Sequence, residues 1–227
     1  MRVKYYIEKL TDELPDDVKL VAISKYHPND VILEAYKAGQ RAFGESHVQE
    51  LLLKQAELPN DIQWHFIGHL QTNKVKFITP FITLIHSVDS LKLLKEIDSQ
   101  AKRCGRTVDC LLQIYVAQEE TKFGFTYPEL KSALDSLCPD GRWALDNVRV
   151  RGLMCMATNT IDENQIRSEF RYTREVFNEI KERYFPEDKY FKELSMGMSD
   201  DYPIAVEEGS TMVRVGSLIF GERNYSQ

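Results

Sequence analysis

Eight short apolar segments alternate with amphipathic helical patterns along this chain, and the alternation leaves few folds open. Several segments carry apolar residues at consecutive positions, which is typical of parallel strands covered on both faces. Strands that alternate with helices form parallel sheets, because each crossover helix returns the chain to the same end of the sheet. The eight segments are residues 19–24, 41–45, 63–68, 84–89, 110–116, 148–156, 190–197 and 211–217.

Three of the intervening segments have clear helical signatures. Residues 29–39 begin with an Asn-Asp pair, either member of which can cap a helix, and end with a glycine. Residues 90–105 run from a serine to a glycine in the same way. Residues 162–184 carry apolar side chains at alternating spacings of 4 and 3, which predicts an amphipathic surface helix.

Eight such units in 227 residues match a (β/α)8 barrel of the TIM type, which typically has ~250 residues. A doubly wound open sheet uses the same alternation, and the number of strands does not exclude it. No linker rich in Gly, Ser or Pro and no shift in composition divides the chain. We therefore expect residues 1–227 to form a single α/β barrel domain.

The composition excludes several classes of protein. Hydrophobic residues make up 43% of the chain, enough for a full core, which excludes a disordered protein. The net charge of −6 argues against a nucleic-acid partner. No apolar run approaches membrane-spanning length, and the start lacks the apolar core of a signal peptide. The four cysteines have no C-x-x-C spacing, so we expect reduced thiols and a cytoplasmic protein.

Chemistry-bearing residues fall where the predicted strands end, which is where barrels of this kind place their sites. Lys25 follows the first strand, and the loops after the last two strands read SMGMSDD and RVGS. Such loops often bind phosphate, and small and hydroxyl residues suit that role. Each feature alone has a simpler interpretation, with the Lys25 ammonium in solvent and Ser199 or Asp200 capping a helix at 200–208. Together they favour an anionic aldehyde cofactor.

Two other kinds of site are less well supported by the sequence. His65 and His69 are four residues apart, but on a strand this spacing is not the helical metal-binding pair. We expect His65 to be a hydrogen-bonded core residue. The loop SMGMSDD has one glycine, so the dinucleotide-binding pattern G-x-G-x-x-G is absent there.

Five stretches of the sequence resemble the pyridoxal-phosphate homeostasis protein family. Members of that family are single-domain barrels, similar to the alanine racemase N-terminal domain, that bind pyridoxal 5′-phosphate (PLP). The resemblance runs from about residue 19 to residue 225, and its last stretch is the most specific. The stretches are VAISKYHP, FGESHVQEL, WHFIGHLQTNKVK, GLMCMA and LSMGMSDDYPIAVEEGSTMVRVGSLIFGERNY.

The resemblance implies a PLP site at the carboxyl end of the barrel. Lys25 would form the internal aldimine, a Schiff base with the cofactor. Arg214 matches the arginine that faces the pyridine nitrogen in the related racemase. The other expected cofactor-binding residues are Ser199, Gly216 and Ser217 at the phosphate, with Met154 and Ser46 lining the pocket. The family usually has Asn at the position of Ser46, so one polar contact is shorter here.

The resemblance also implies a role in intracellular PLP (vitamin B6) homeostasis, and the residues favour that role over catalysis. A guanidinium donates hydrogen bonds only, so Arg214 cannot strengthen the electron sink of PLP as a carboxylate would. Racemisation needs an acid or base on each face of the substrate. In two-domain racemases the second one comes from a domain that we do not expect here.

We therefore expect a PLP carrier or regulator without substantial amino-acid turnover. Apo-enzymes that use PLP are candidate partners, and we expect a monomer that binds neither nucleic acid nor membranes. A PLP-dependent amino-acid racemase and a Schiff-base aldolase on the same barrel are the alternatives.

Overall fold

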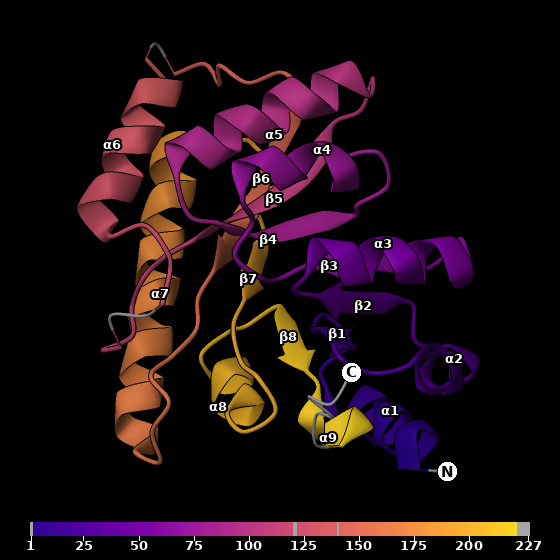
Figure 1. Ribbon diagram of the computed structural model, residues 1–227. Coiled ribbons are helices and arrows are strands. Elements are labelled where there is room, and N and C mark those ends of the chain that lie inside the picture. Colours follow the sequence, from indigo (N-terminus) through magenta and orange to yellow (C-terminus); the bar gives the residue numbers. More distant parts are fainter. Residues whose placement is uncertain (1, 120–121, 140, 222–227) are drawn as a thin grey trace.

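Eight parallel strands close into a barrel in the computed structural model, which describes residues 2–119, 122–139 and 141–221 (Figure 1). Each strand pairs with the next along the chain, and the last pairs with the first. The (β/α)8 barrel is therefore confirmed, and the open sheet is excluded. The strands are β1 Lys19–Ile23, β2 Ala42–Glu45, β3 Gln63–Phe66, β4 Leu84–Val88, β5 Val108–Gln113, β6 Val148–Met154, β7 Glu193–Ser195 and β8 Met212–Val215.

Helices surround the barrel, and α6 and α7 lie side by side along one flank of it (Figure 1). On that flank the Tyr127 hydroxyl donates to Glu179, and Arg183 pairs with Asp135 at 3.1 Å. The helices are α1 Arg2–Glu13, α2 Asn29–Lys37, α3 Val48–Glu57, α4 Val75–Ile78, α5 Leu91–Arg103, α6 Tyr127–Leu137, α7 Glu163–Tyr184, α8 Tyr202–Glu207 and α9 Ser217–Phe220, with a short 3-10 helix η1 at Thr72–Lys74.

The predicted helix starts are confirmed for α5 and α7. The Ser90 hydroxyl accepts a hydrogen bond from the Leu93 amide, and the Asp162 carboxylate accepts from the Asn164 amide. Both are side-chain caps that satisfy amides left without a partner inside the helix.

The fifth strand differs from its predicted extent of 110–116. It ends at Gln113, because the chain then folds back and pairs Ile114 with Phe125. Tyr115 therefore lies in the loop after β5, where its hydroxyl donates to the Glu119 carbonyl.

The barrel has two hydrophobic cores. The larger one fills the space between strands and helices, and the smaller one lies inside the barrel. The inner core consists of Val21, Ile23, Ala42, Leu84, Leu111, Met154 and Met212. So few apolar side chains leave room for buried polar residues inside the barrel, and these matter for the site.

The strand register brings three predicted site segments to one rim. Ala22 of β1 is opposite Val215 of β8 and opposite Phe43 of β2. The carboxyl end of β1 is therefore flanked by those of β8 and β2. Residues that follow these three strands lie next to one another at the carboxyl rim of the barrel.

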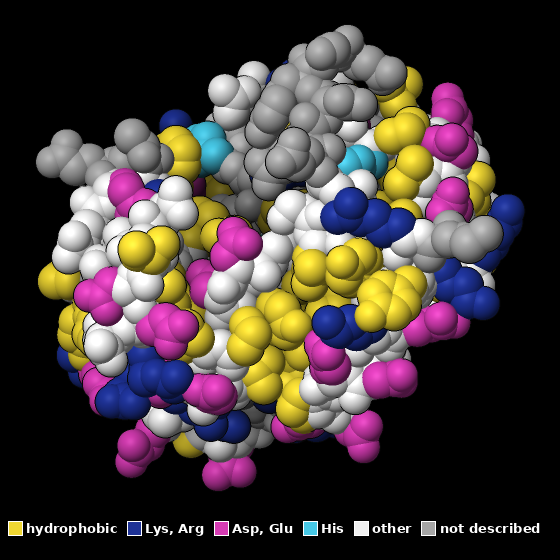
Figure 2. Space-filling view, turned by 90° about the horizontal axis from the view of Figure 1, so that it is seen from below, with side chains coloured by type: hydrophobic (Ala, Val, Ile, Leu, Met, Phe, Trp, Pro, Cys, Tyr) yellow, Lys and Arg dark blue, Asp and Glu magenta, His cyan; other side chains and the backbone are white. Residues whose placement is uncertain are grey.

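All four cysteines belong to the described residues, and each is a free thiol. Burial raises the pKa of Cys155 to about 12, so this thiol is inert at neutral pH. Among the described helices, none is long and apolar enough to cross a membrane. On the face drawn in Figure 2, basic and acidic side chains are interspersed around a band of apolar ones.

Candidate functional site

Lys25 lies two residues beyond β1, in a turn that its neighbours hold firmly. The turn closes with a hydrogen bond from the His27 amide to the Ser24 carbonyl at 3.1 Å. Tyr26 has a φ of 65°, a left-handed conformation that is costly for a bulky side chain. Its amide donates to the Glu50 carboxylate at 2.6 Å, which stabilises this conformation. The Lys25 side chain is therefore directed from a fixed backbone position at the rim.

A charged cluster of Lys54, Glu45 and Glu50 contacts the same turn. Lys54 of α3 is buried and donates to the Ser24 carbonyl, to Glu45 and to Glu50, at distances of 2.8, 2.8 and 2.7 Å. The Ser24 hydroxyl also donates to Glu45 at 2.6 Å. Glu45 is fully buried, and its second carboxylate oxygen has no hydrogen-bond partner. Burial raises the pKa of Glu45 to about 7, although the Lys54 ammonium opposes this shift.

We expect this carboxyl group to make the folded protein less stable as the pH rises from about 5 to 7. In this range folded Glu45 still holds a proton that the unfolded chain, with a pKa of 4.5, has lost. Its contribution is fully present below the unfolded pKa and is lost through the folded pKa, at most about 3 kcal/mol. Urea unfolding of the wild type and of Glu45→Gln checks this. The advantage of the wild type should shrink across the range, and a constant difference would contradict the raised pKa.

The loops after β7 and β8 are joined by a single hydroxyl group. The Ser199 oxygen accepts hydrogen bonds from the amides of Gly216 and Leu218, at 3.2 and 3.5 Å. The simpler interpretation of Ser199 as the cap of a helix at 200–208 is therefore wrong. That helix is α8, which begins at Tyr202 after Asp201 and has no side-chain cap.

Gly197 and Gly216 give these loops their close packing. Gly197 has a φ of +88°, and a Cβ atom there would lie 2.6 Å from the Ala205 side chain. A Cβ atom on Gly216 would lie 3.2 Å from the Cβ and carbonyl oxygen of Ile23, at the end of β1. The β8 loop thus packs directly on the strand that leads to Lys25. Ser217 follows as an exposed residue at the start of α9.

Arg214 lies inside the barrel with its guanidinium fixed by three acceptors. Nη1 donates to the Ser195 carbonyl at 2.9 Å and to the Ser195 hydroxyl at 2.6 Å, and Nη2 donates to the Cys155 carbonyl at 2.8 Å. Arg214 is only 3% exposed, and burial lowers its pKa from the ordinary value. Guanidinium nonetheless stays protonated in proteins. The site therefore contains a buried permanent cation.

The two expected pocket-lining residues have different surroundings. Met154 ends β6 and is fully buried in the inner core with Val21 and Ile23. Ser46 follows β2 at the rim, partly exposed, and its hydroxyl contacts Nδ1 of His47 at 3.1 Å. Met154 thus lies in the inner core at the carboxyl end of β6, whereas Ser46 is on the same rim as Lys25.

Two polar side chains that the sequence did not single out belong to the surroundings of the site. His86 and Ser195 lie inside the barrel, between Arg214 and His65. His65 is a buried hydrogen-bonded residue, as expected. Asp89, which ends the predicted strand 84–89 and directly follows β4, pairs with His69 at 2.8 Å.

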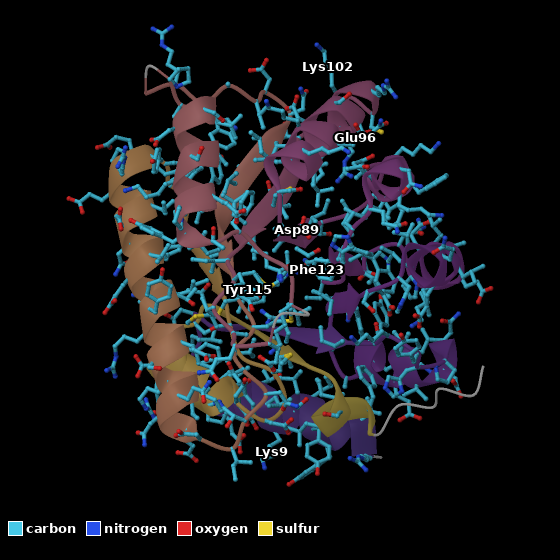
Figure 3. The ribbon with its side chains drawn as sticks, turned by 60° about the vertical axis from the view of Figure 1, so that its left-hand side comes forward. Lys9, Asp89, Glu96, Lys102, Tyr115 and Phe123 are labelled. Carbon is cyan, nitrogen blue, oxygen red and sulfur yellow. The ribbon has the colours of Figure 1, made fainter. Side chains whose placement is uncertain are left out.

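The His69 ring in turn stacks on Phe123 with a centroid distance of 4.0 Å. Figure 3 shows Asp89 and Phe123 close together, on the segments that follow β4 and β5. This stack fixes one side of the rim. Across the described residues, no group of three His, Cys, Asp or Glu side chains could hold a metal ion.

Comparison with known proteins identifies the family. The alanine racemase N-terminal domain family matches residues 2–224. A relative from Aquifex aeolicus named pyridoxal phosphate homeostasis protein is 41% identical over 208 residues, which cover 91% of this chain and 88% of the relative. The human protein of the same name is 38% identical over 241 residues, which cover 100% of this chain and 84% of that protein. This chain belongs to the pyridoxal phosphate homeostasis protein family.

Solved structures agree with this family and with the fold. PipY of Synechococcus elongatus, in a structure with PLP bound, superposes with a TM-score of 0.88 at 38% identity and covers 96% of this chain and 100% of its own. Alanine racemase from E. faecalis superposes with a TM-score of 0.71 at 16% identity. That match covers 99% of this chain and 58% of the racemase chain, and at such low identity it shows the barrel alone.

Proposed function

We propose that this chain binds PLP as a Schiff base on Lys25 and takes part in intracellular PLP homeostasis. The observation that carries the proposal is the position of Lys25 on the same rim as the two loops joined by Ser199. An amine beside hydroxyl groups and backbone amides suits a ligand that carries both an aldehyde and a phosphate.

The donor set fits PLP at each of its functional groups. The hydroxyls of Ser199 and Ser217 and the tightly packed Gly216 backbone suit the phosphate. The fixed guanidinium of Arg214 suits the unprotonated pyridine nitrogen, which accepts a hydrogen bond. Bound PLP would supply an aldehyde, which condenses with the Lys25 amine to form a C=N bond with release of water.

Titration of the apo-protein with PLP tests the binding proposal. We expect a new visible absorbance band that saturates at one equivalent. Pyridoxine 5′-phosphate is the matched control, since it has the phosphate and ring but no aldehyde, and should bind without the band. A protein that binds neither compound contradicts the proposal.

We expect Ser199→Ala combined with Ser217→Ala to weaken PLP more than pyridoxal, which lacks the phosphate. Each lost hydrogen bond to a charged group costs about 1.5–3 kcal/mol, so two of them lower PLP affinity by at least about a hundredfold. Parallel binding titrations with the two vitamers measure the difference. Equal weakening of both would place the phosphate elsewhere.

We further propose that the chain does not turn over amino acids at enzyme rates. Arg214 donates to the Ser195 and Cys155 carbonyls and has no proton-accepting atom to offer a cofactor ring. Tyr115 is one candidate for a second acid or base, but its hydroxyl is bonded to the Glu119 carbonyl. Tyr225 could supply a phenol as well, but it lies outside the described residues. A PLP-dependent racemase remains the second candidate function, because racemases have the same barrel.

Chiral analysis of alanine and serine incubated with the PLP-loaded protein in D₂O separates these functions. We expect no racemisation beyond a slow exchange of the α-proton, because loss of one acid or base removes about 10²–10⁴-fold in rate. Turnover at ~1–10³ per second would establish the racemase instead.

The working state that we propose is a single cytoplasmic domain that acts as a monomer and passes PLP to apo-enzymes. The closed barrel supports a single domain that acts as a monomer, since its eight strands pair with one another without a strand from a second chain. The four free thiols fit a reducing compartment. Mixing the loaded protein with an apo-enzyme that uses PLP, and following recovery of activity, tests the transfer.

A further inference from the structure

A continuous chain of four polar side chains crosses the barrel interior and ends at Arg214. Arg214 Nη1 contacts the Ser195 hydroxyl at 2.6 Å, and this hydroxyl contacts Nδ1 of His86 at 3.0 Å. Nε2 of His86 then contacts Nδ1 of His65 at 2.8 Å. The four residues come from β8, β7, β4 and β3, and none is more than 3% exposed. Neither histidine nor Ser195 has a role in the function proposed above.

The two directions of hydrogen-bond donation along this chain differ in how many buried groups they leave unsatisfied. Guanidinium only donates, so Ser195 accepts from Arg214. If the Ser195 proton then points at Nδ1 of His86, His86 carries its hydrogen on Nε2 and donates it to His65. His65 in turn carries its hydrogen on Nε2, the atom that has no partner. This direction leaves one buried donor unsatisfied.

The opposite direction is less favourable. His65 would donate to His86 and His86 to Ser195, so that the Ser195 proton and the Nε2 lone pair of His65 would both lack partners. Each unsatisfied buried group costs about 1–3 kcal/mol.

Both rings must also be neutral, because a charged imidazole would put a second cation beside Arg214. Burial lowers the pKa of His65 to about 3 and that of His86 well below its ordinary value, and the charges of Lys19 and Arg214 add to the effect on His86.

We propose that Ser195 and His86 are positioning residues that hold the Arg214 guanidinium in one orientation, and that this keeps the pyridine nitrogen of bound PLP unprotonated. The inference rests on the proposed function, in which Arg214 faces that nitrogen. The hydrogen-bonded series Ser195, His86 and His65 contains neutral groups and no carboxylate. It therefore orients the Arg214 cation without neutralising it or supplying a proton. PLP held in this way is a weaker electron sink, which suits storage better than carbanion chemistry.

Two nitrogen-15 NMR measurements test the inference separately. In the apo-protein, both His65 and His86 should be neutral with hydrogen on Nε2. In the protein loaded with PLP labelled at the ring nitrogen, the signal should be that of an unprotonated ring. Hydrogen on Nδ1 of either histidine overturns the directional chain, whatever PLP does. A protonated ring in the wild type overturns the effect on the cofactor.

Matched variants test whether the positioning residues act through Arg214. Ser195→Ala and His86→Phe should move the ring-nitrogen signal and the visible absorbance maximum. His86→Asn keeps an acceptor for the Ser195 proton and should restore the wild-type values. Thr79→Val removes a buried hydroxyl after α4, outside the barrel, and should change neither.

Identical spectra in all variants would overturn the positioning role. Absence of PLP binding in the wild type would contradict the proposed function, and with it the effect on the ring. The imidazole signals of the apo-protein would still decide the direction of the chain.

Discussion

Lys25→Ala should lose the whole of the visible absorbance that PLP produces in the wild type. The variant removes the amine that forms the C=N bond, so no partial effect is expected. The fold should be unchanged, because Lys25 lies in a partly exposed turn beyond β1 and outside both cores. Absorbance titration and circular dichroism of the same samples measure the two effects.

Lys25→Arg separates the covalent role from the charge. It retains a cation at the rim but no nucleophilic amine, so it should also lack the absorbance band. Lys37→Ala, on the surface helix α2, is the control and should behave as the wild type. A visible adduct in either Lys25 variant would mean that a different lysine forms the bond.

Lys54→Met should destabilise the apo-protein by about 3–5 kcal/mol, because it leaves a buried ion pair with only one sign of charge. Methionine fills the space of the lysine stem, so the loss reports the charge and not a cavity. Glu45 and Glu50 would both lose their cation, and the Ser24 carbonyl would lose a donor. The loss should be greater at pH 8 than at pH 5.5, since Glu45 can take up a proton at the lower pH.

Urea unfolding at both pH values measures this effect. Lys37→Met is the matched control on an exposed helix face and should change stability by less than about 0.5 kcal/mol. Adding Glu45→Gln to Lys54→Met should recover part of the loss at pH 8. A cost below about 1 kcal/mol for Lys54→Met would contradict the structural role given to the cluster.

The barrel could be predicted from the sequence because its strands are covered on both faces and read as continuous apolar runs. The common position of Lys25 and Ser199 at the carboxyl rim could be predicted as well, since parallel strands bring all their carboxyl ends to one rim. The end of β5 was misplaced because Ile114, Tyr115 and Val116 continue the apolar run although the chain folds back there. Local apolar character does not distinguish a strand from the loop that extends it.

Apart from His65 and Arg214, the buried polar groups could not be predicted, because they depend on pairing between distant elements. Lys54 has the sequence context of an ordinary exposed lysine on an amphipathic helix, yet it is buried against Glu45 of β2. Ser195 and His86 are 109 positions apart and meet only because β7 and β4 share the barrel interior. A charged residue that ends an otherwise apolar strand, as Glu45 does, was the one available signal.

Reduction of the PLP-loaded protein with borohydride, followed by peptide mass mapping, tests directly whether Lys25 holds PLP as a Schiff base. Borohydride converts the C=N bond into a stable secondary amine, which marks the lysine that formed it. We expect one modified peptide, which contains Lys25, with the modification on that residue. Modification of a different lysine, or an unmodified chain from a sample that had shown the absorbance band, would contradict this expectation.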